Sequence, residues 1–239
     1  SGQVGQIIEE AFWICFRKAS IETYSSRGVL QTADVRIASE DMSKFVDSIP
    51  VIPKEMADVP FVKKLIDFGL ISHITVTDVK KELETKAMNK VQLINFISWA
   101  GKKSFSGELD PGSRDALLEV AVGTMSDDGE QGEIIALGSI KNHLIANRIP
   151  TSLPIPPTTI PHALTANSSS SELQALGWEP LEILPWLRFL LETGAARSED
   201  ESLTKSPKFA VQVLTVLAKN FENSTATART TIVSLLQAN

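Results

Sequence analysis

The stretch PFVKKLIDFGL, residues 60–70, carries a start signal and a stop signal for a helix with an apolar stripe between them. Its leading proline suits the first turn of a helix, where the missing N–H has no partner to lose. Phe61, Leu65 and Phe68 are four and three residues apart, so they give this helix an apolar stripe. The glycine that follows is a common helix stop. The stretch therefore predicts a short amphipathic helix.

Two further helices are predicted after this one. Thr75 and Asp78 have the spacing of a helix-capping pair, and residues 91–99 have the apolar periodicity of a third helix. A short β-favouring segment, residues 71–76, separates the first helix from the second. Three short helices within residues 60–101 predict a helix-turn-helix-like arrangement, for which a winged-helix-like fold is one interpretation.

The rest of the chain is also predicted to be mainly helical. A strong helical pattern begins at Pro207, whereas residues 133–137 favour a short strand. Prolines and serines are concentrated in residues 149–170, which predicts an extended, packed connector. The predicted fold class is mainly α, with compact helical bundles and a small β element. The predicted parts are a helical domain at 1–148, the connector at 149–170 and a C-terminal helical part at 171–239.

Three further expectations concern individual residues. Ser139 is expected to cap a short helix that continues to Leu144. Cys15 lies among aromatic and aliphatic neighbours, so we expect a buried and unreactive thiol. Glu82 and Glu84 are expected on a solvent-exposed helix face, because nothing in their neighbourhood marks a buried acidic pair.

Composition places the chain in an ordinary globular class. It has 239 residues, of which 43% are hydrophobic, and a formal net charge of −6. No apolar run approaches the roughly 20 residues that cross a bilayer, and no secretion signal is present. A single cysteine excludes an internal disulfide and fits a reducing compartment. We therefore expect a soluble, intracellular protein, cytoplasmic or nuclear, and its Ser1-Gly2 start is typical of a piece released from a tag.

The motifs of common catalytic and phosphate-binding sites are absent from the sequence. It contains neither a P-loop, nor a dinucleotide-binding glycine motif, nor a Gly-x-Ser-x-Gly nucleophile turn. The three histidines, His73, His143 and His162, do not have the spacing that places two imidazoles on one helix face. The acidic tract at 126–132 lacks the register of a calcium-binding loop. We therefore expect no catalytic residue, no cofactor and no metal ligand.

Basic and aromatic residues provide the candidates for partner binding. Residues 60–148 contain 11 basic and 12 acidic side chains, so nucleic acid is an improbable partner for this region. The expected partner is a protein or another domain of the parent chain, and no membrane contact is expected. Tryptophan is enriched at interface hot spots, although core packing is the default for these residues. The candidate partner-binding residues are Trp178, Trp186, Lys63 and Lys64.

Several phrases of the sequence resemble a region of large, uncharacterised fungal proteins. The phrases are SIPVIPKE at 48–55, PFVKKLIDFGL at 60–70, IIALGSIK at 134–141, ALGW at 175–178 and PWL at 185–187. Those proteins carry, upstream, an ATP-binding domain similar to the one shared by gyrase, heat-shock chaperones, histidine kinases and sacsin. The resemblance spans roughly residues 10–192. It implies a module downstream of the ATPase domain and carries over no catalytic residue.

These observations favour a non-enzymatic helical module that serves partner binding, scaffolding or contact between domains. The first alternative is a winged-helix-like nucleic-acid-binding module centred on residues 60–101, which would bind with steep salt dependence. The second alternative is an unrecognised enzyme whose site is assembled from distant segments around His143 or His162. That alternative requires a polar pocket lined by a histidine and a carboxylate.

Overall fold

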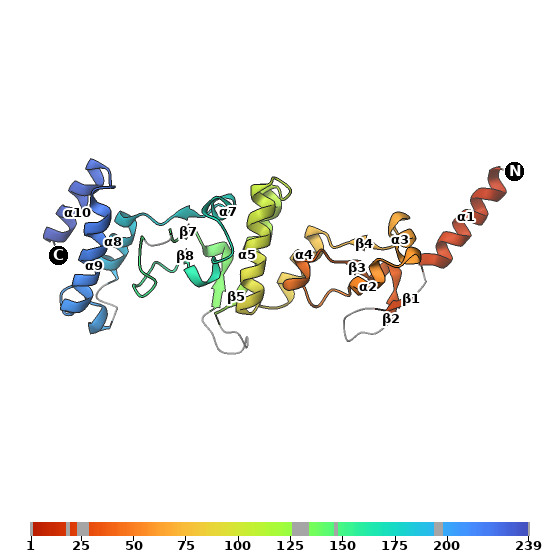
Figure 1. Cartoon of the computed structure of the whole chain (residues 1–239), viewed down its shortest axis with the longest axis horizontal. Coiled ribbons are helices and arrows are strands. Elements are labelled where there is room, and N and C mark those ends of the chain that lie inside the picture. The colour runs from red at the N-terminus through yellow and green to blue at the C-terminus, as the bar shows by residue number, and fades with distance from the viewer. Residues whose placement is uncertain are drawn as a thin grey trace. The chain divides into compact units, whose positions relative to one another are not determined.

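The computed structural model describes residues 2–17, 20–22, 29–125, 134–145, 148–193 and 198–238. Over these residues the fold is mainly α with small sheets, which confirms the predicted class (Figure 1). The helices are α1 (Gly2–Arg17), α2 (Lys54–Ala57), α3 (Pro60–Asp67), α4 (Val76–Thr85), α5 (Lys90–Phe105), α6 (Pro111–Val120), α7 (Ser170–Ala175), α8 (Ile183–Glu192), α9 (Pro207–Phe221) and α10 (Ala226–Ala238). The strands are β1 (Ser20–Glu22), β2 (Val29–Gln31), β3 (Arg36–Ile37), β4 (Ser72–His73), β5 (Val122–Thr124), β6 (Ile134–Ala136), β7 (Asn142–His143), β8 (Thr159–Ile160) and β9 (Glu179–Pro180).

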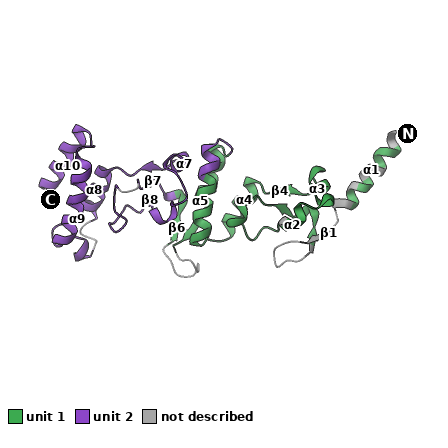
Figure 2. Ribbon diagram, viewed as in Figure 1, with its two compact units in different colours: residues 1–100, 109–138 green, residues 101–108, 139–239 purple. Residues whose placement is uncertain are grey.

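The chain divides into two compact units (Figure 2). Unit 1 contains residues 1–100 and 109–138, and unit 2 contains residues 101–108 and 139–239. The division therefore falls within α5, and the segment predicted as a connector, residues 149–170, lies inside unit 2.

Local signals in the sequence determine where α3 and α4 begin and end. α3 starts at Pro60, and Gly69, beyond its end, has a φ of +69°, in the left-handed region that favours glycine. At the start of α4, the side chain of Thr75 accepts the backbone N–H of Asp78, and the Asp78 carboxylate accepts the backbone N–H of Thr75. This capping box confirms the predicted pair.

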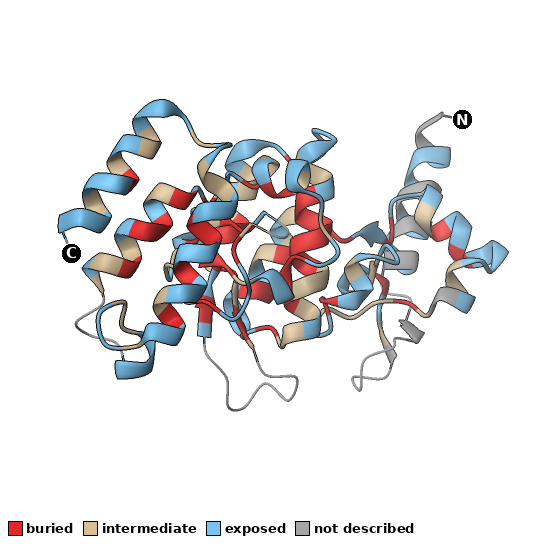
Figure 3. Cartoon of the chain, turned by 60° about the vertical axis from the view of Figure 1, so that its left-hand side comes forward, coloured by how far each residue is buried: buried red, intermediate tan, exposed pale blue. Residues whose placement is uncertain are grey.

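Figure 3 colours the chain by burial, and the buried residues of unit 1 include an aliphatic cluster and an aromatic cluster. Val62 and Leu65 of α3 pack in the aliphatic cluster with residues that precede β3 and β4. In the aromatic cluster, the ring of Phe45 lies 5.5 Å from that of Phe96 and 5.3 Å from that of Trp99, measured between centroids. Such edge-on and tilted contacts add to the stability gained by burying the rings.

The strands of unit 1 form two-stranded sheets. β1 pairs with β2 and β5 pairs with β6, both antiparallel, whereas β3 and β4 are parallel. The strand predicted at 133–137 is present as β6, and residue 133 lies outside the described residues. α4 packs against α6, and the β5–β6 pair follows α6 in the chain.

Unit 2 contains a parallel three-stranded sheet in the order β8-β7-β9. The helix predicted from Ser139 to Leu144 is wrong, because this segment forms β7. The backbone N–H of Lys141 donates to Thr158 O at 2.8 Å, and that of Leu181 donates to His143 O at 2.8 Å. These partners are distant in sequence, and they favour an extended backbone over the local helix signal.

The helical core of unit 2 is built from α8, α9 and α10. Trp186, Leu187 and Leu190 of α8 pack in one buried cluster with residues of α9 and α10. The indole N–H of Trp186 donates to Pro154 O at 2.9 Å, so the proline-rich segment contacts α8 at this point. Pro185 is the third residue of α8, in the first turn, where its ring breaks no intrahelical hydrogen bond.

Candidate partner-binding surface

Two of the candidate partner-binding residues, Lys63 and Lys64, lie on the exposed side of α3. Val62 and Leu65 form the buried side of this helix. Relative to the predicted stripe, the buried side is therefore rotated towards Val62. Phe61 and Phe68 are left on the exposed flank, although the sequence pattern placed them with Leu65.

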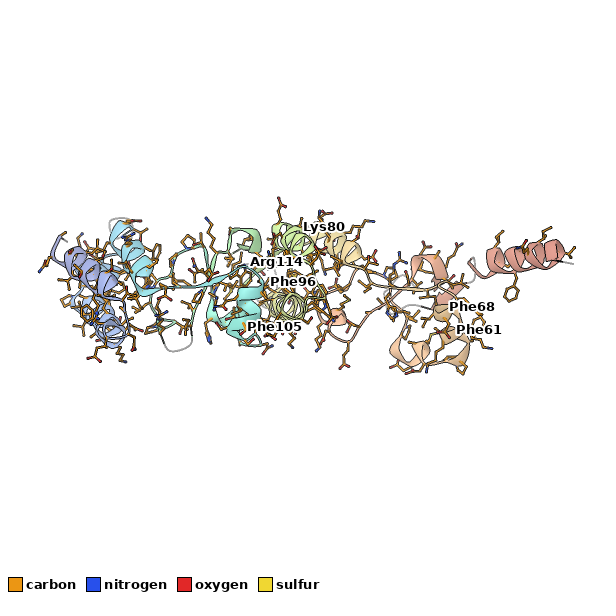
Figure 4. The ribbon with its side chains drawn as sticks, turned by 90° about the horizontal axis from the view of Figure 1, so that it is seen from above. Phe61, Phe68, Lys80, Phe96, Phe105 and Arg114 are labelled. Atoms are coloured by element: carbon orange, nitrogen blue, oxygen red, sulfur yellow. The ribbon has the colours of Figure 1, made fainter. Side chains whose placement is uncertain are left out.

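The exposed flank of α3 combines two aromatic rings with a cation. Phe61 and Phe68, both labelled in Figure 4, are 54% and 58% exposed. Lys64 lies on the same flank at helical spacings of three and four residues. We call Phe61, Lys64 and Phe68 the α3 face. Lys63 extends to the side, where its Nζ lies 3.1 Å from Asp58 Oδ1. Both side chains of this ion pair are exposed, so the pair contributes little to stability and leaves the lysine accessible.

Trp178 and Trp186, the other two candidates, are not surface anchors. Trp178 is 1% exposed and Trp186 is 0% exposed. A side chain can act as a hot spot only if a partner can cover it, and these two are already covered by the fold. Both are core residues, so the interpretation of Trp178 and Trp186 as exposed partner anchors is wrong.

The structure places the three histidines in different environments. His73 and His162 are exposed, whereas His143 in β7 is 1% exposed. The Nδ1 atom of His143 lies 2.9 Å from Trp178 O, and its Nε2 atom lies 3.0 Å from Ser170 Oγ. A carbonyl oxygen can only accept, so Nδ1 carries the proton and Nε2 accepts the hydroxyl of Ser170 when the ring is neutral.

Burial lowers the pKa of His143, because it penalises the charged form more than the nearby carbonyl and the charge of Glu179 favour it. The neutral ring links β7 to the start of α7 and to the residue before β9. The group that orients Nδ1 is the backbone carbonyl of Trp178, whereas the enzyme alternative required a polar pocket lined by a histidine and a carboxylate. Two hollows lie beside α9, and neither His143 nor His162 lines them.

A buried carboxylate that the sequence pattern missed lies in α4. Glu82 was expected on a solvent-exposed face and is instead buried. Its Oε1 atom accepts the backbone N–H groups of Asp47 at 3.1 Å and Ser48 at 2.9 Å, and its other oxygen accepts the Ser48 hydroxyl. Three donors from one loop explain why an acid is tolerated in this interior position.

Asp47, in the same loop, is held by side chains from two helices. Burial by itself would raise the pKa of Asp47, but its ion pair with Lys86 and a hydrogen bond from Gln92 outweigh that effect and lower it. The carboxylates of Glu82 and Asp47 thus bind the loop to α4 and α5. This arrangement is structural, because the polar groups named here bind one another.

The remaining features to consider are metal ligands, the thiol of Cys15 and membrane-spanning helices. Within the described ranges, no group of three or more His, Cys, Asp or Glu side chains is placed to hold a metal ion. The acidic tract at 126–132 falls outside those ranges. Cys15 is exposed on α1, which corrects the expectation of a buried thiol. Among the helices that the structure describes, none is both long and apolar enough to cross a membrane.

These features describe a mainly helical domain whose described polar clusters maintain the fold and whose α3 carries an exposed aromatic and basic face. The chain belongs to the family described as a protein of unknown function, DUF3684, whose model matches residues 1–239. No curated protein and no solved structure matches the chain.

Proposed function

We propose that this chain is a non-catalytic module that binds a protein partner, or another domain of its own chain, through the α3 face. The module would belong to a large intracellular protein of the fungal, ATPase-like kind that the sequence resembles. The observation that carries the proposal is the exposure of Phe61 and Phe68 on one flank of a well-anchored helix. Exposed aromatic side chains beside a cation are typical of interaction sites.

The α3 face indicates the chemistry of its partner. The two rings would be covered by apolar side chains, and Lys64, between them on the helix surface, would be matched by a carboxylate. Phe61 and Phe68 are seven residues apart and so about 10 Å apart along the helix axis. A partner surface with two apolar groups at that separation and an acidic group between them fits this face.

The test is affinity capture by the chain and by the double variant Phe61→Ser/Phe68→Ser, with quantitative mass spectrometry of what is retained. We expect at least about tenfold lower recovery of the specific partner with the variant, because truncating a hot-spot aromatic costs about 2 kcal/mol or more. The matched control is Phe105→Ser, which removes an exposed ring, 64% accessible, from α5. Equal recovery by the chain and the double variant contradicts the proposal.

Nucleic-acid binding is a second candidate, because α4, α5 and α6 are followed by the antiparallel pair β5–β6, the order typical of winged-helix domains. The charges on these helices weigh against it. Lys80 pairs with Glu84, Arg114 with Asp115 and Lys86 with Asp47, so these cations have anionic neighbours. Duplex DNA titrated at two salt concentrations tests the candidate, and affinity that falls steeply with salt would support it.

A further inference from the structure

Two hollows follow each other along α9 in unit 2. The first, about 420 Å³, lies at the start of α9, and the second, about 200 Å³, lies along its later turns. Ser152 and Gln212 line both hollows, so the two hollows adjoin each other beside α9 and the segment around Pro150. We call the two hollows together the α9 groove, and the second hollow is lined by Pro150, Ser152, Leu153, Val211, Gln212 and Thr215 among others.

The two ends of the α9 groove carry opposite charges. Asp200 and Glu201 line the first hollow together with Lys208, which leaves one net negative charge there. Lys219 is the charged residue that lines the second hollow. An occupant that places a cation at the first end and an anion at the other would be attracted at both ends.

The second hollow of the α9 groove has apolar side chains beside the polar Ser152, Gln212 and Thr215. Leu153 and Val216 are buried at its floor, and Val211 stands on its wall with 63% of its surface exposed. An occupant with apolar side chains in its central part would cover Val211 without disturbing the packed core.

The dimensions of the groove select an extended occupant. Lys208 and Lys219 are about 16 Å apart along the axis of α9, at 1.5 Å per residue. An extended chain rises about 3.3 Å per residue, so about five residues span this distance. A helix of this length, about 10–12 Å across with its side chains, has about twice or more the combined volume of the two hollows.

We propose that the α9 groove binds an extended peptide segment of about five residues, with a basic side chain at one end, an acidic side chain at the other and apolar residues between them. The groove lies in unit 2 and the α3 face lies in unit 1, so this binding site is additional to the proposed function.

The test uses three capped pentapeptides with a common leucine-proline-leucine centre. One has lysine and glutamate ends, one has two lysine ends and one has two glutamate ends. NMR or fluorescence titration of the whole chain at low salt should rank the lysine–glutamate peptide first. Lys219→Glu should change the preference to the two-lysine peptide, and Asp200→Lys/Glu201→Lys should change it to the two-glutamate peptide, each by about fivefold to tenfold.

A second pair of variants tests the contact with Val211. Val211→Ser should weaken binding of the lysine–glutamate peptide several-fold, whereas Leu214→Ser, on the same helix and outside the groove lining, should not. Equal binding of the three peptides, an unchanged ranking in the charge variants or no binding up to millimolar peptide would overturn the proposal. Phe61→Ser/Phe68→Ser should leave peptide binding unchanged, so failure of one proposal does not imply failure of the other.

Discussion

The side chain of Leu93 occupies the space above Gly123. A Cβ atom built at Gly123 would lie 2.7 Å from Cδ2 of Leu93, closer than two carbon atoms can approach. Leu93 is buried in α5 and Gly123 lies in β5, so the absence of a side chain at residue 123 lets the strand pack directly against the helix.

Gly123→Ala should therefore destabilise the protein. We expect a loss of about 1–3 kcal/mol in the free energy of unfolding, because Leu93 must leave its place in a packed core. Chemical denaturation of the two proteins measures the difference. Gly5→Ala is the control, since a Cβ there meets nothing within 4 Å, and we expect it to raise stability slightly or leave it unchanged. Similar midpoints for Gly123→Ala and the unchanged chain would show that β5 does not pack on Leu93.

Leu217→Ala should remove a central contact of the helical core in unit 2. Leu217 is 4% exposed and belongs to the cluster formed by α8, α9 and α10. We expect a loss of about 2–5 kcal/mol, the usual range for truncating a buried leucine. Leu214→Ala, on the same helix but 48% exposed, should change stability by less than about 0.5 kcal/mol. A denaturation midpoint that Leu217→Ala leaves unchanged would mean that α9 is rotated from the orientation described here.

His143 should make stability depend on pH in the acidic range. The pKa of His143 is lowered by burial from its ordinary value of about 6.5, so the unfolded chain binds the proton more tightly than the folded chain. Below about 6.5 the unfolded state therefore holds more protons, and the free energy of unfolding rises with pH. The stability that depends on the neutral ring is fully present above that pH and is lost as the pH falls towards the lowered pKa.

His143→Asn tests this dependence. The asparagine amide can still donate to Trp178 O but cannot take up a proton, so the variant should be less stable at neutral pH and its stability should fall less between pH 7 and pH 5. Denaturation midpoints measured across this range give the two slopes. His162→Gln, which removes an exposed imidazole, is the matched control. A slope in His143→Asn that equals that of the unchanged chain would contradict the assignment.

Glu82→Ala should release the loop that contains Asp47 and Ser48. The substitution removes the acceptor of two backbone N–H groups and of the Ser48 hydroxyl in an interior position. We expect a cost of about 2–4 kcal/mol, because each buried donor left unpaired is unfavourable by about 1–3 kcal/mol. Glu82→Gln keeps a carbonyl oxygen for the two N–H groups and should cost less. If the alanine variant is no less stable than the glutamine variant, the loop is not held by these bonds.

Features that depend on neighbouring residues in the chain could be predicted from the sequence. The capping pair Thr75 and Asp78, the proline start of α3 and the strand β6 all follow from residues within one turn or one strand. β7 could not be predicted, because a two-residue strand is too short for an apolar alternation and its hydrogen-bond partners come from β8 and β9.

Which residues lie on the exposed side of α3 could be predicted only in part. The exposed lysines of α3 were identified, but Phe61 and Phe68 were placed on the apolar stripe. Apolar residues three and four positions apart identify a broad face of a helix but not the centre of that face. In α3 the buried face is centred nearer Val62, which leaves the rings of Phe61 and Phe68 exposed. Glu82 was misplaced for a related reason, since its loop donors are more than thirty residues away in sequence.

The way the two units interleave along the polypeptide limits how the protein can be dissected. Residues 101–108 belong to unit 2 but are inserted between two segments of unit 1. Within unit 2, Gly101 approaches α7 so closely that a Cβ there would lie 3.2 Å from Cβ of Glu172. Truncation after residue 138 would therefore deprive the C-terminal fragment of the end of α5, and no single cleavage of the backbone yields two intact halves.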